Sequence, residues 1–461
     1  MIKRADFLVF ILFFLWLYPA VASDQPGFPE VELTAQDRVL IMAPHPDDEV
    51  LGCAGIIQKA LAAKLPVKIV FLTYGDNNEW AFLLYRKHPV FVSRSVQGMG
   101  QVRHDEAIAA AKEMGLSADN LIFLGYPDFG TYNIWLSHWG AAKAFKSMLT
   151  KVRAVPYSNA LRPDAAYKGD DILKDIETVL SDFKPTKIFL SHPGDHNGDH
   201  RALYLFTRVA LWDLKGWMQP QLYPYLIHFK NWPLPRGYRP EMSIEPPGFF
   251  DEKVDWSADN LALPDVEQKE AAIRAHRSQY KSCPGYLSSF IRRNELFGDY
   301  SVIKLIPDAL PVFFNEDECH QLPTQEQLTD TQKAGVLGIE RRYVQLEKGN
   351  LVLSMRFSRP LVKGLGITVY VFGFRQDTDF VQMPKLRIHL GFVGHSIYDR
   401  GRALPKNSVR LVRSSREVVL YIPLELLGTP QRILSSVTAS MSDVPVDWVS
   451  WQIIELFTAN K

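Results

Sequence analysis

The sequence is poor in cysteine, has almost no excess charge, and lacks both a basic tract and the serine-hydrolase elbow motif. Its three cysteines, at positions 53, 283 and 319 of 461, are too few for a disulfide framework. The net charge of +1 and the absence of a basic tract exclude a nucleic-acid partner held by bulk electrostatics. No Gly-x-Ser-x-Gly elbow occurs, which argues against a Ser-His-Asp esterase.

The N-terminus carries the features of an export signal. Lys3 and Arg4 precede the apolar run 7–17, and small residues follow at Ala20 and Ala22. The run is shorter than the ~20 residues that span a bilayer. We therefore expect residues 1–22 to be a cleaved signal peptide, with a periplasmic or extracellular mature protein. The alternative is an uncleaved anchor, and only then do we expect contact with a membrane.

The most informative stretch is the run Ala-Pro-His-Pro-Asp-Asp-Glu at positions 43–49. The run 38–42 before it, which is apolar after Arg38, predicts a buried strand, and residues 50–65 after it predict a helix. Ligands in open α/β sheets bind just beyond the carboxyl ends of strands. His45 and Asp48 can reach one point, and imidazole and carboxylate are ordinary zinc ligands. Asp47 between them is suited to act as a general base.

Strand-like and helix-like runs alternate from residue 36 to about 305. The predicted strands are 67–73, 121–124 and 187–190, and the predicted helices are 102–114, 170–183 and 203–214. Such alternation predicts a Rossmann-like α/β domain with a mostly parallel sheet. The strand ends at 44–49, 74–76, 125–128 and 192–200 are then expected at one edge of the sheet, where they can form a metal site.

Two motifs carry a resemblance to a known family. Residues 44–49, Pro-His-Pro-Asp-Asp-Glu, and residues 194–202, Gly-Asp-His-Asn-Gly-Asp-His-Arg-Ala, resemble the LmbE-like, or PIG-L, zinc N-deacetylases. The resemblance implies removal of acetyl groups from a small or polymeric N-acetylglucosamine-type substrate. It implies that His45, Asp48 and His200 bind Zn²⁺, with Fe²⁺ as the alternative metal, and that Asp47 is the general base.

Further residues match the family pattern, and one departs from it. Arg103, on an Arg-x-x-Glu helix, and Asp128, at a Leu-Gly-x-x-Asp strand end, are implied to line the substrate pocket. Family members commonly have a histidine three residues before the last zinc ligand, but Asn197 stands there. Asn197 and its neighbour His196 are therefore both candidate catalytic residues, and His192 is a further candidate acid. Because neighbouring side chains of an extended segment point to opposite sides, we expect Asn197 to face the metal.

The C-terminal part differs in character. Residues 306–335, punctuated by prolines at 307, 311 and 323, are predicted to be a linker. Short alternating runs after residue 336 predict an antiparallel β-sandwich up to residue 461, and residues 419–428 resemble carbohydrate-binding modules. The linker predicts that residues 24–310 fold without the sandwich.

A second reading of the same residues remains open. The chain could be a non-catalytic zinc- and sugar-binding component of a polysaccharide or glycoconjugate assembly system. Measured turnover on an N-acetyl amine separates the two readings. The sequence does not determine the oligomeric state.

Overall fold

The computed structural model describes residues 27–77, 93–248, 250, 254–314, 337–441 and 444–457. The predicted signal peptide at 1–22 and Cys319 lie outside the described residues. Within those residues, no helix combines the length and the hydrophobicity that a bilayer span needs.

The N-terminal part is built on one parallel sheet. Its strand order is β3-β2-β1-β4-β5, and every neighbouring pair is parallel. The strands are β1 (Val39–Ala43), β2 (Val67–Thr73), β3 (Leu121–Tyr126), β4 (Lys187–Ser191) and β5 (Gln221–Tyr225). The residues of β1 and β4 are all buried, as expected for strands covered on both faces. The predicted Rossmann-like parallel sheet is confirmed.

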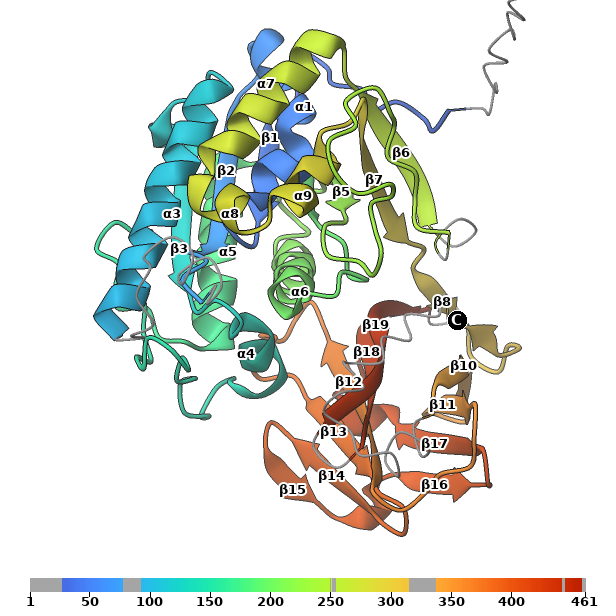
Figure 1. Ribbon diagram of the computed structural model, residues 1–461. Coiled ribbons are helices and arrows are strands. Elements are labelled where there is room, and N and C mark those ends of the chain that lie inside the picture. The colour runs from blue at the N-terminus through green and yellow to red at the C-terminus, as the bar shows by residue number, and fades with distance from the viewer. Residues whose placement is uncertain are drawn as a thin grey trace, which may run out of the picture.

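Helices cover both faces of this sheet (Figure 1). One group holds α1 (Asp48–Ala62), α3 (Ser93–Glu113) and α7 (Leu263–Ala275), which pack together, and the other holds α4 (Thr131–Ser137), α5 (Gly169–Phe183) and α6 (Gly198–Asp213). The short helices α8 (Arg277–Ser282) and α9 (Pro284–Leu287) follow α7. A two-stranded antiparallel sheet of β6 (Val254–Asn260) and β7 (Asn294–Tyr300), which lie on either side of α7 to α9 in the chain, completes this part.

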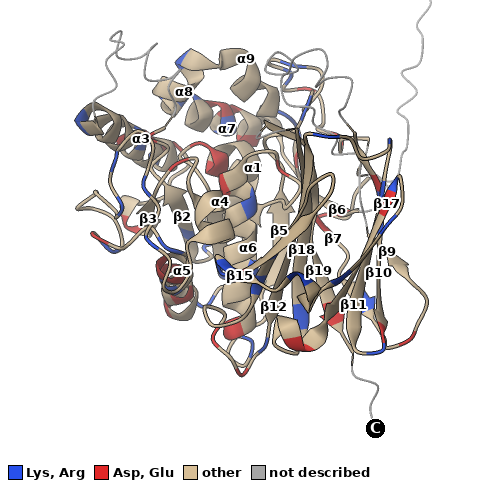
Figure 2. Ribbon diagram, turned by 90° about the horizontal axis from the view of Figure 1, so that it is seen from below, with Lys and Arg blue, Asp and Glu red and all other residues tan. Residues whose placement is uncertain are grey.

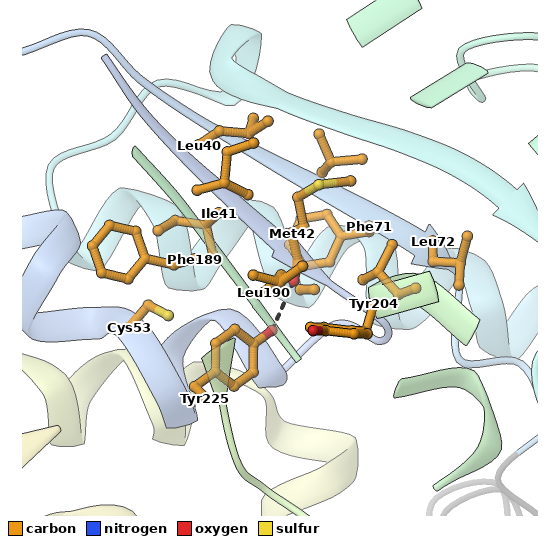
Figure 3. Packing of buried hydrophobic residues seen from close by; sticks show 14 of the residues in the cluster. Leu40, Ile41, Met42, Cys53, Phe71, Leu72, Phe189, Leu190, Tyr204 and Tyr225 are labelled. Atoms are coloured by element: carbon orange, nitrogen blue, oxygen red, sulfur yellow. Dashed lines mark hydrogen bonds between the residues drawn. The ribbon is translucent and has the colours of Figure 1, made fainter. Parts of the chain in front are cut away.

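The sheet reverses its strand order between β1 and β4, which pair with each other. The loops after these two strands carry the two predicted motifs, and such a switch point is the usual ligand site of an open α/β sheet. Helix α1 approaches the sheet closely because Gly52 has no side chain: a Cβ there would lie 2.7 Å from the ring of Tyr225. Tyr225 in turn donates a hydrogen bond to the carbonyl of Met42 at 2.9 Å (Figure 3).

The C-terminal part consists of two further sheets. One has the order β16-β17-β11-β10-β9, and the other has the order β15-β14-β13-β12-β18-β19-β8. Their strands are β8 (Ile303–Leu305), β9 (Val312–Phe313), β10 (Ile339–Glu347), β11 (Asn350–Phe357), β12 (Leu365–Phe374), β13 (Lys385–Leu390), β14 (His395–Asp399), β15 (Arg402–Leu404), β16 (Arg410–Arg413), β17 (Glu417–Pro423), β18 (Arg432–Met441) and β19 (Val444–Leu456). All pairs are antiparallel except β19 with β8. The predicted antiparallel β-rich C-terminal region is therefore present.

Strand β12 of the seven-stranded sheet contributes side chains to two hydrophobic cores, one on each face. In β12, Ile367 and Val369 belong to the core of the sandwich, whereas Phe372 and Phe374 belong to the core of the α/β part. Strands β12, β18 and β19 lie alongside α6 (Figure 2). The two parts thus meet through an apolar seam, not only through the chain between them.

The seam is centred on Trp135 of α4, which is completely buried. Its ring lies 5.6 Å from Phe372, 5.7 Å from Phe380 and 5.8 Å from Trp451, measured between centroids. A fragment ending near residue 310 lacks Phe372, Phe380 and Trp451 and would leave Trp135 without this cover, which argues against the expectation that residues 24–310 fold alone.

The stretch around the predicted linker 306–335 is only partly described. The predicted boundary at 305 falls at the end of β8, which already pairs with β19 of the second part. Strand β9 then pairs with β10, and residues 315–336 lie outside the described residues.

Candidate metal centre

The loops after β1 and β4 bring the two motifs together. His45 leaves the end of β1, and Asp48 begins α1. His200 lies in the first turn of α6, which follows β4. All three side chains are buried, so the parallel sheet places residues from distant parts of the chain in one small volume.

Four side chains offer ligand atoms within 4.8 Å of one another: those of His45, Asp48, His200 and His228. Oδ2 of Asp48 lies 3.1 Å from Nδ1 of His45 and 3.1 Å from Nε2 of His200. Two imidazoles and a carboxylate are a common protein ligand set for catalytic zinc. The structure thus brings the three predicted ligands together and adds His228 beside them.

The second nitrogen of each predicted ligand histidine faces a buried carboxylate. Nε2 of His45 lies 3.1 Å from Asp128 and 3.3 Å from Asp199. Nδ1 of His200 lies 3.1 Å from Oδ2 of Asp195. Carboxylates in this position orient metal-binding imidazoles and make them more basic.

The charges around the histidines suit a cation. Burial by itself lowers the pKa of His45, but Asp128 and the other nearby carboxylates outweigh it and raise that pKa well above its ordinary value. Burial likewise raises the pKa of Asp48, yet the two histidines bring it well below its usual range. Several ionised carboxylates in a buried volume require a compensating positive charge, and a divalent cation would supply it. The donor set therefore fits the predicted metal.

Asp47 is held in an unusual backbone conformation at the start of α1. Its φ is 135° and its ψ is −28°, a combination that costs free energy for a residue with a side chain. The backbone N–H of Asp47 donates to Glu49 at 2.8 Å, and His276 contacts the other oxygen of Glu49 at 2.7 Å. Arg103 donates to the carbonyl of Pro46 at 2.6 Å and to Oδ1 of Asp47 at 3.2 Å. These contacts maintain the strained turn.

The surroundings of Asp47 also change its acidity. Burial raises the pKa of Asp47 to about 6, although the Arg103 guanidinium opposes the shift. A carboxylate with a pKa near neutrality is a better proton acceptor than an ordinary aspartate. The geometry thus gives Asp47 the properties expected of a general base.

A cavity of about 150 Å³ opens onto this group. The predicted residues His45, Asp47, Asp48, Arg103, Asp128 and Asn197 line it, together with Leu51, Phe129, His228, Gln279, Ser282, Cys283, Tyr286 and Leu287. This mixture of polar groups and apolar side chains suits a small ligand with an acyl group.

The neighbours Asn197 and His196 point to different sides, as expected. Asn197 lines the cavity, and its side chain caps α6 by accepting a hydrogen bond from the N–H of Asp199 at 2.8 Å. The ring of His196 instead stacks on Phe229 at 4.4 Å and meets Trp448 edge-on at 5.8 Å. The structure does not bring His196 to the centre, because alternate side chains of the extended segment before α6 diverge.

His192 is also not at the centre. It is completely buried beside Phe250, and its Nδ1 accepts a hydrogen bond from the N–H of Gly194 at 2.9 Å. Its ring therefore holds the loop after β4 and does not reach the cavity.

Sequence reasoning missed His228. It follows β5, and its ring lies 4.8 Å from that of His200, while its Nδ1 lies 3.2 Å from the Tyr286 hydroxyl. Burial lowers the pKa of His228 to about 4. The signal was weak because β5 contains Pro224, a residue that argues against a strand unless the strand lies at a sheet edge, as β5 does.

Comparisons with known proteins agree with this geometry. Residues 40–211 match the family model of PIG-L, described as GlcNAc-PI de-N-acetylase. A relative from Mycobacterium sp. (strain JLS), 1D-myo-inositol 2-acetamido-2-deoxy-alpha-D-glucopyranoside deacetylase, is 25% identical over 288 residues, which are 60% of this chain and 83% of the relative.

Solved structures resemble the same part of the chain. The A40926 pseudoaglycone deacetylase Dbv21 is 16% identical, with 57% of this chain and 96% of that chain covered and a TM-score of 0.36. An N,N'-diacetylchitobiose deacetylase from Pyrococcus horikoshii is 19% identical, with 54% and 75% covered and a TM-score of 0.32. From the family match over residues 40–211, which spans both histidine motifs, the chain contains a PIG-L (LmbE-like) family deacetylase domain followed by a β-rich C-terminal region.

Proposed function

We propose that this protein is a metal-dependent N-deacetylase that removes the acetyl group from an N-acetylglucosamine-type amine. The observation that carries the proposal is the convergence of ligand atoms from His45, Asp48 and His200 within 4.8 Å, beside a cavity that Asp47 also lines. The family match over residues 40–211 supports the same reaction.

The metal, zinc or ferrous iron, would supply Lewis-acid polarisation of the acetyl carbonyl and activation of water. His45, Asp48 and His200 would hold it, and Asp128, Asp199 and Asp195 would keep the two imidazoles in place. This division between ligands and orienting carboxylates follows from the contacts at 3.1–3.3 Å.

Asp47 takes the proton of the attacking water in this proposal. Its pKa of about 6 leaves it ionised at neutral pH yet basic enough to accept a proton. Arg103, which donates to Asp47 and to the carbonyl of Pro46, keeps the carboxylate directed along the cavity wall. Amide hydrolysis therefore has its base on a rigid turn at the end of β1.

The leaving amine needs a proton, and Asp47 can return to it the proton taken from the water, because both groups face the same cavity. With a pKa of about 4, His228 is neutral at neutral pH and can only hydrogen-bond to the amine. Its ring lines the same cavity, and the Tyr286 hydroxyl at 3.2 Å from Nδ1 fixes its orientation. Asn197, whose carbonyl oxygen caps α6, keeps its amide N–H groups for the acyl oxygen. His228 thus takes the place beside the leaving amine that the sequence suggested for His196, as a hydrogen-bonding group and not as the acid.

The test is acetate release from N-acetylglucosamine and from N,N'-diacetylchitobiose by zinc-loaded protein, with and without chelator. His200→Ala should lose both bound metal and turnover. His138→Ala is the matched control, because His138 contacts the carbonyl of Lys143 at 2.7 Å and does not line the cavity. Full zinc content and full activity in His200→Ala would refute the ligand set. Bound zinc without turnover on any N-acetyl amine would favour the non-catalytic alternative.

We further propose that the protein is exported, on the basis of the charged start, the apolar run 7–17 and the small residues at 20 and 22. N-terminal sequencing of the mature protein from its native host tests this. A chain that begins after residue 22 supports the proposal, and an intact Met1 terminus in the cytoplasmic fraction contradicts it.

A further inference from the structure

Arg201 occupies a distinctive place at the seam between the two parts of the protein. Its guanidinium carbon lies 4.4 Å from the ring centre of Tyr132 in α4 and 4.0 Å from that of Trp448 in β19. Tyr132 is itself held by Trp451, whose Nε1 donates to its hydroxyl at 2.9 Å. The cation is thus clamped between two aromatic rings that a helix and a strand of different parts keep in place.

In the described part of the chain, the hydrogen-bonding capacity of the Arg201 guanidinium is not fully used. Among the described residues, no carboxylate lies within ion-pair distance of its guanidinium, and Nε is buried without an acceptor. Stacking satisfies the faces of a guanidinium but not the N–H groups at its edge. By contrast Arg208, further along α6, pairs with Asp299 at 3.4 Å.

The surroundings of Arg201 favour an anion. Arg201 and Lys230 both act to lower the pKa of the neighbouring His196, which shows that the two cations lie close to the same ring. Lys230 is exposed, and it too has no ion-pair partner in the part of the chain that the structure describes. The charge of Asp195 also acts on this ring, but that carboxylate is engaged by His200 and by backbone N–H groups. Arg201 and Lys230 thus leave a positively charged spot beside it.

This spot adjoins the cavity. Asn197 and Phe129 line the cavity, and Arg201 and Tyr132 lie four and three residues after them, on α6 and α4. From Asn197, the N-cap of α6, to Arg201 the separation is about one helical turn, roughly 5.4 Å along the axis. Phe129 lines the cavity and is 57% accessible, so its ring lies at the mouth of the cavity. A sugar bound at the mouth could therefore reach both the metal centre and Arg201.

We propose that Arg201, clamped between Tyr132 and Trp448, binds an anionic group, a carboxylate or a phosphate, that the substrate carries close to its acetylated amine. The inference rests on the proposed deacetylase function and narrows its substrate to an acidic glycoconjugate. It also gives the C-terminal region a part in recognition, because Trp448 supplies one wall of the site. The planar fork of N–H groups in the guanidinium fits both a carboxylate and a phosphate. Experiment must therefore decide which of the two anions binds.

The experiment compares N-acetylglucosamine, N-acetylglucosamine 1-phosphate and N-acetylmuramic acid as substrates of the zinc-loaded enzyme. We expect the wild type to show at least about a tenfold lower KM for one of the acidic sugars, the size of effect that a charge-assisted hydrogen bond gives. Arg201→Gln should remove this preference and leave kcat and KM for N-acetylglucosamine unchanged. Lys215→Gln removes an exposed charge just after α6 and should leave the preference intact.

Three outcomes would overturn the inference. One is a wild type with no preference for either acidic sugar, and another is an Arg201→Gln variant that keeps the preference. The third is an equal rise in KM for the neutral sugar in Arg201→Gln, which would show that the clamp is only structural. The acidic sugar that is preferred identifies the anion as phosphate or carboxylate.

Calorimetric binding separates this inference from the proposed function. If no probe releases acetate, the deacetylase proposal fails, and the affinities of wild type and Arg201→Gln for the acidic and neutral sugars then decide the subsite. Equal affinity for all three sugars would refute it, and tighter acidic binding that Arg201→Gln abolishes would support it.

Discussion

Replacing Asp195 by Asn should weaken metal binding without touching a proposed ligand. Oδ2 of Asp195 faces Nδ1 of His200 at 3.1 Å and accepts from the backbone N–H groups of Ile227 at 3.0 Å and His228 at 2.8 Å. Its Oδ1 accepts from the N–H of Asn197 at 2.8 Å. Both oxygens therefore serve as acceptors.

An amide cannot reproduce this pattern, because one of its two ends is a donor. If the NH₂ group in Asp195→Asn were placed at the Oδ1 position, it would oppose the N–H of Asn197. If it were placed at the Oδ2 position, it would oppose Nδ1–H of His200 and the N–H groups of Ile227 and His228. The amide would also lack the negative charge that makes the imidazole a stronger ligand. Loss of such a supporting carboxylate typically weakens metal affinity about 10–100-fold, which is about 1.4–2.7 kcal/mol.

The assay is the zinc dissociation constant from chelator competition, with urea unfolding of the metal-free protein to check the fold. Asp175→Asn is the matched control: Asp175 is also buried and accepts from Tyr126 at 2.6 Å and Arg162 at 2.7 Å, but it does not contact the metal centre. A zinc dissociation constant within about twofold of the wild type in Asp195→Asn would refute the reasoning, since the expected loss is at least about tenfold. An equal weakening in Asp175→Asn would show that lost stability, not lost orientation, is the cause.

Three further predictions concern catalysis, the seam and pH. Asp47→Asn should keep its zinc and lose about 10²–10⁴ in kcat, and wild-type turnover would contradict the base. Trp135→Ala should lower the free energy of unfolding by about 3–5 kcal/mol and shift one cooperative urea transition, whereas two separate transitions would contradict a shared core. Burial lowers the pKa of His192 from 6.5 to about 3, so the neutral form stabilises the fold fully above pH 6.5 and this contribution is lost as the pH falls towards 3. The unfolding free energy should then drop by about 1.4 kcal/mol more per pH unit below about 6.5 in the wild type than in His192→Gln, and equal slopes would contradict the prediction.

The elements around the first motif were predictable because their signals are local. The apolar run before His45 and the small residues after it predicted a strand and a helix, and the structure has β1 and α1 there. The helix α3 starts at Ser93, earlier than the predicted residue 102. Val96 and Met99 are buried there, but the glycines at 98 and 100 weaken the local helical signal. Boundaries of this kind depend on packing and not on local pattern.

The sandwich strands were predictable for a similar reason, but their second buried face was not. The alternation in β12 indicates a strand, and Ile367 and Val369 mark the face towards the sandwich core. That Phe372 and Phe374 pack against the α/β part depends on how two sheets and a helix meet. A period-two pattern predicts which side chains share a face of the strand, but it does not predict which other sheet or helix packs on that face.

The sequence by itself determined the fold class, the metal motif and the order of its parts, because hydrophobic periodicity and motif spacing act within a few residues. It placed His45, Asp48 and His200 at strand ends that a parallel sheet must gather at one edge. Only the tertiary structure decided that Asp195, Asp128 and Asp199 hold the histidines, that His228 and not His196 faces the cavity, and that Trp448 clamps Arg201. These contacts join segments that lie far apart in the chain, and their geometry is set by how the sheets and helices pack, for which no local pattern gives a signal.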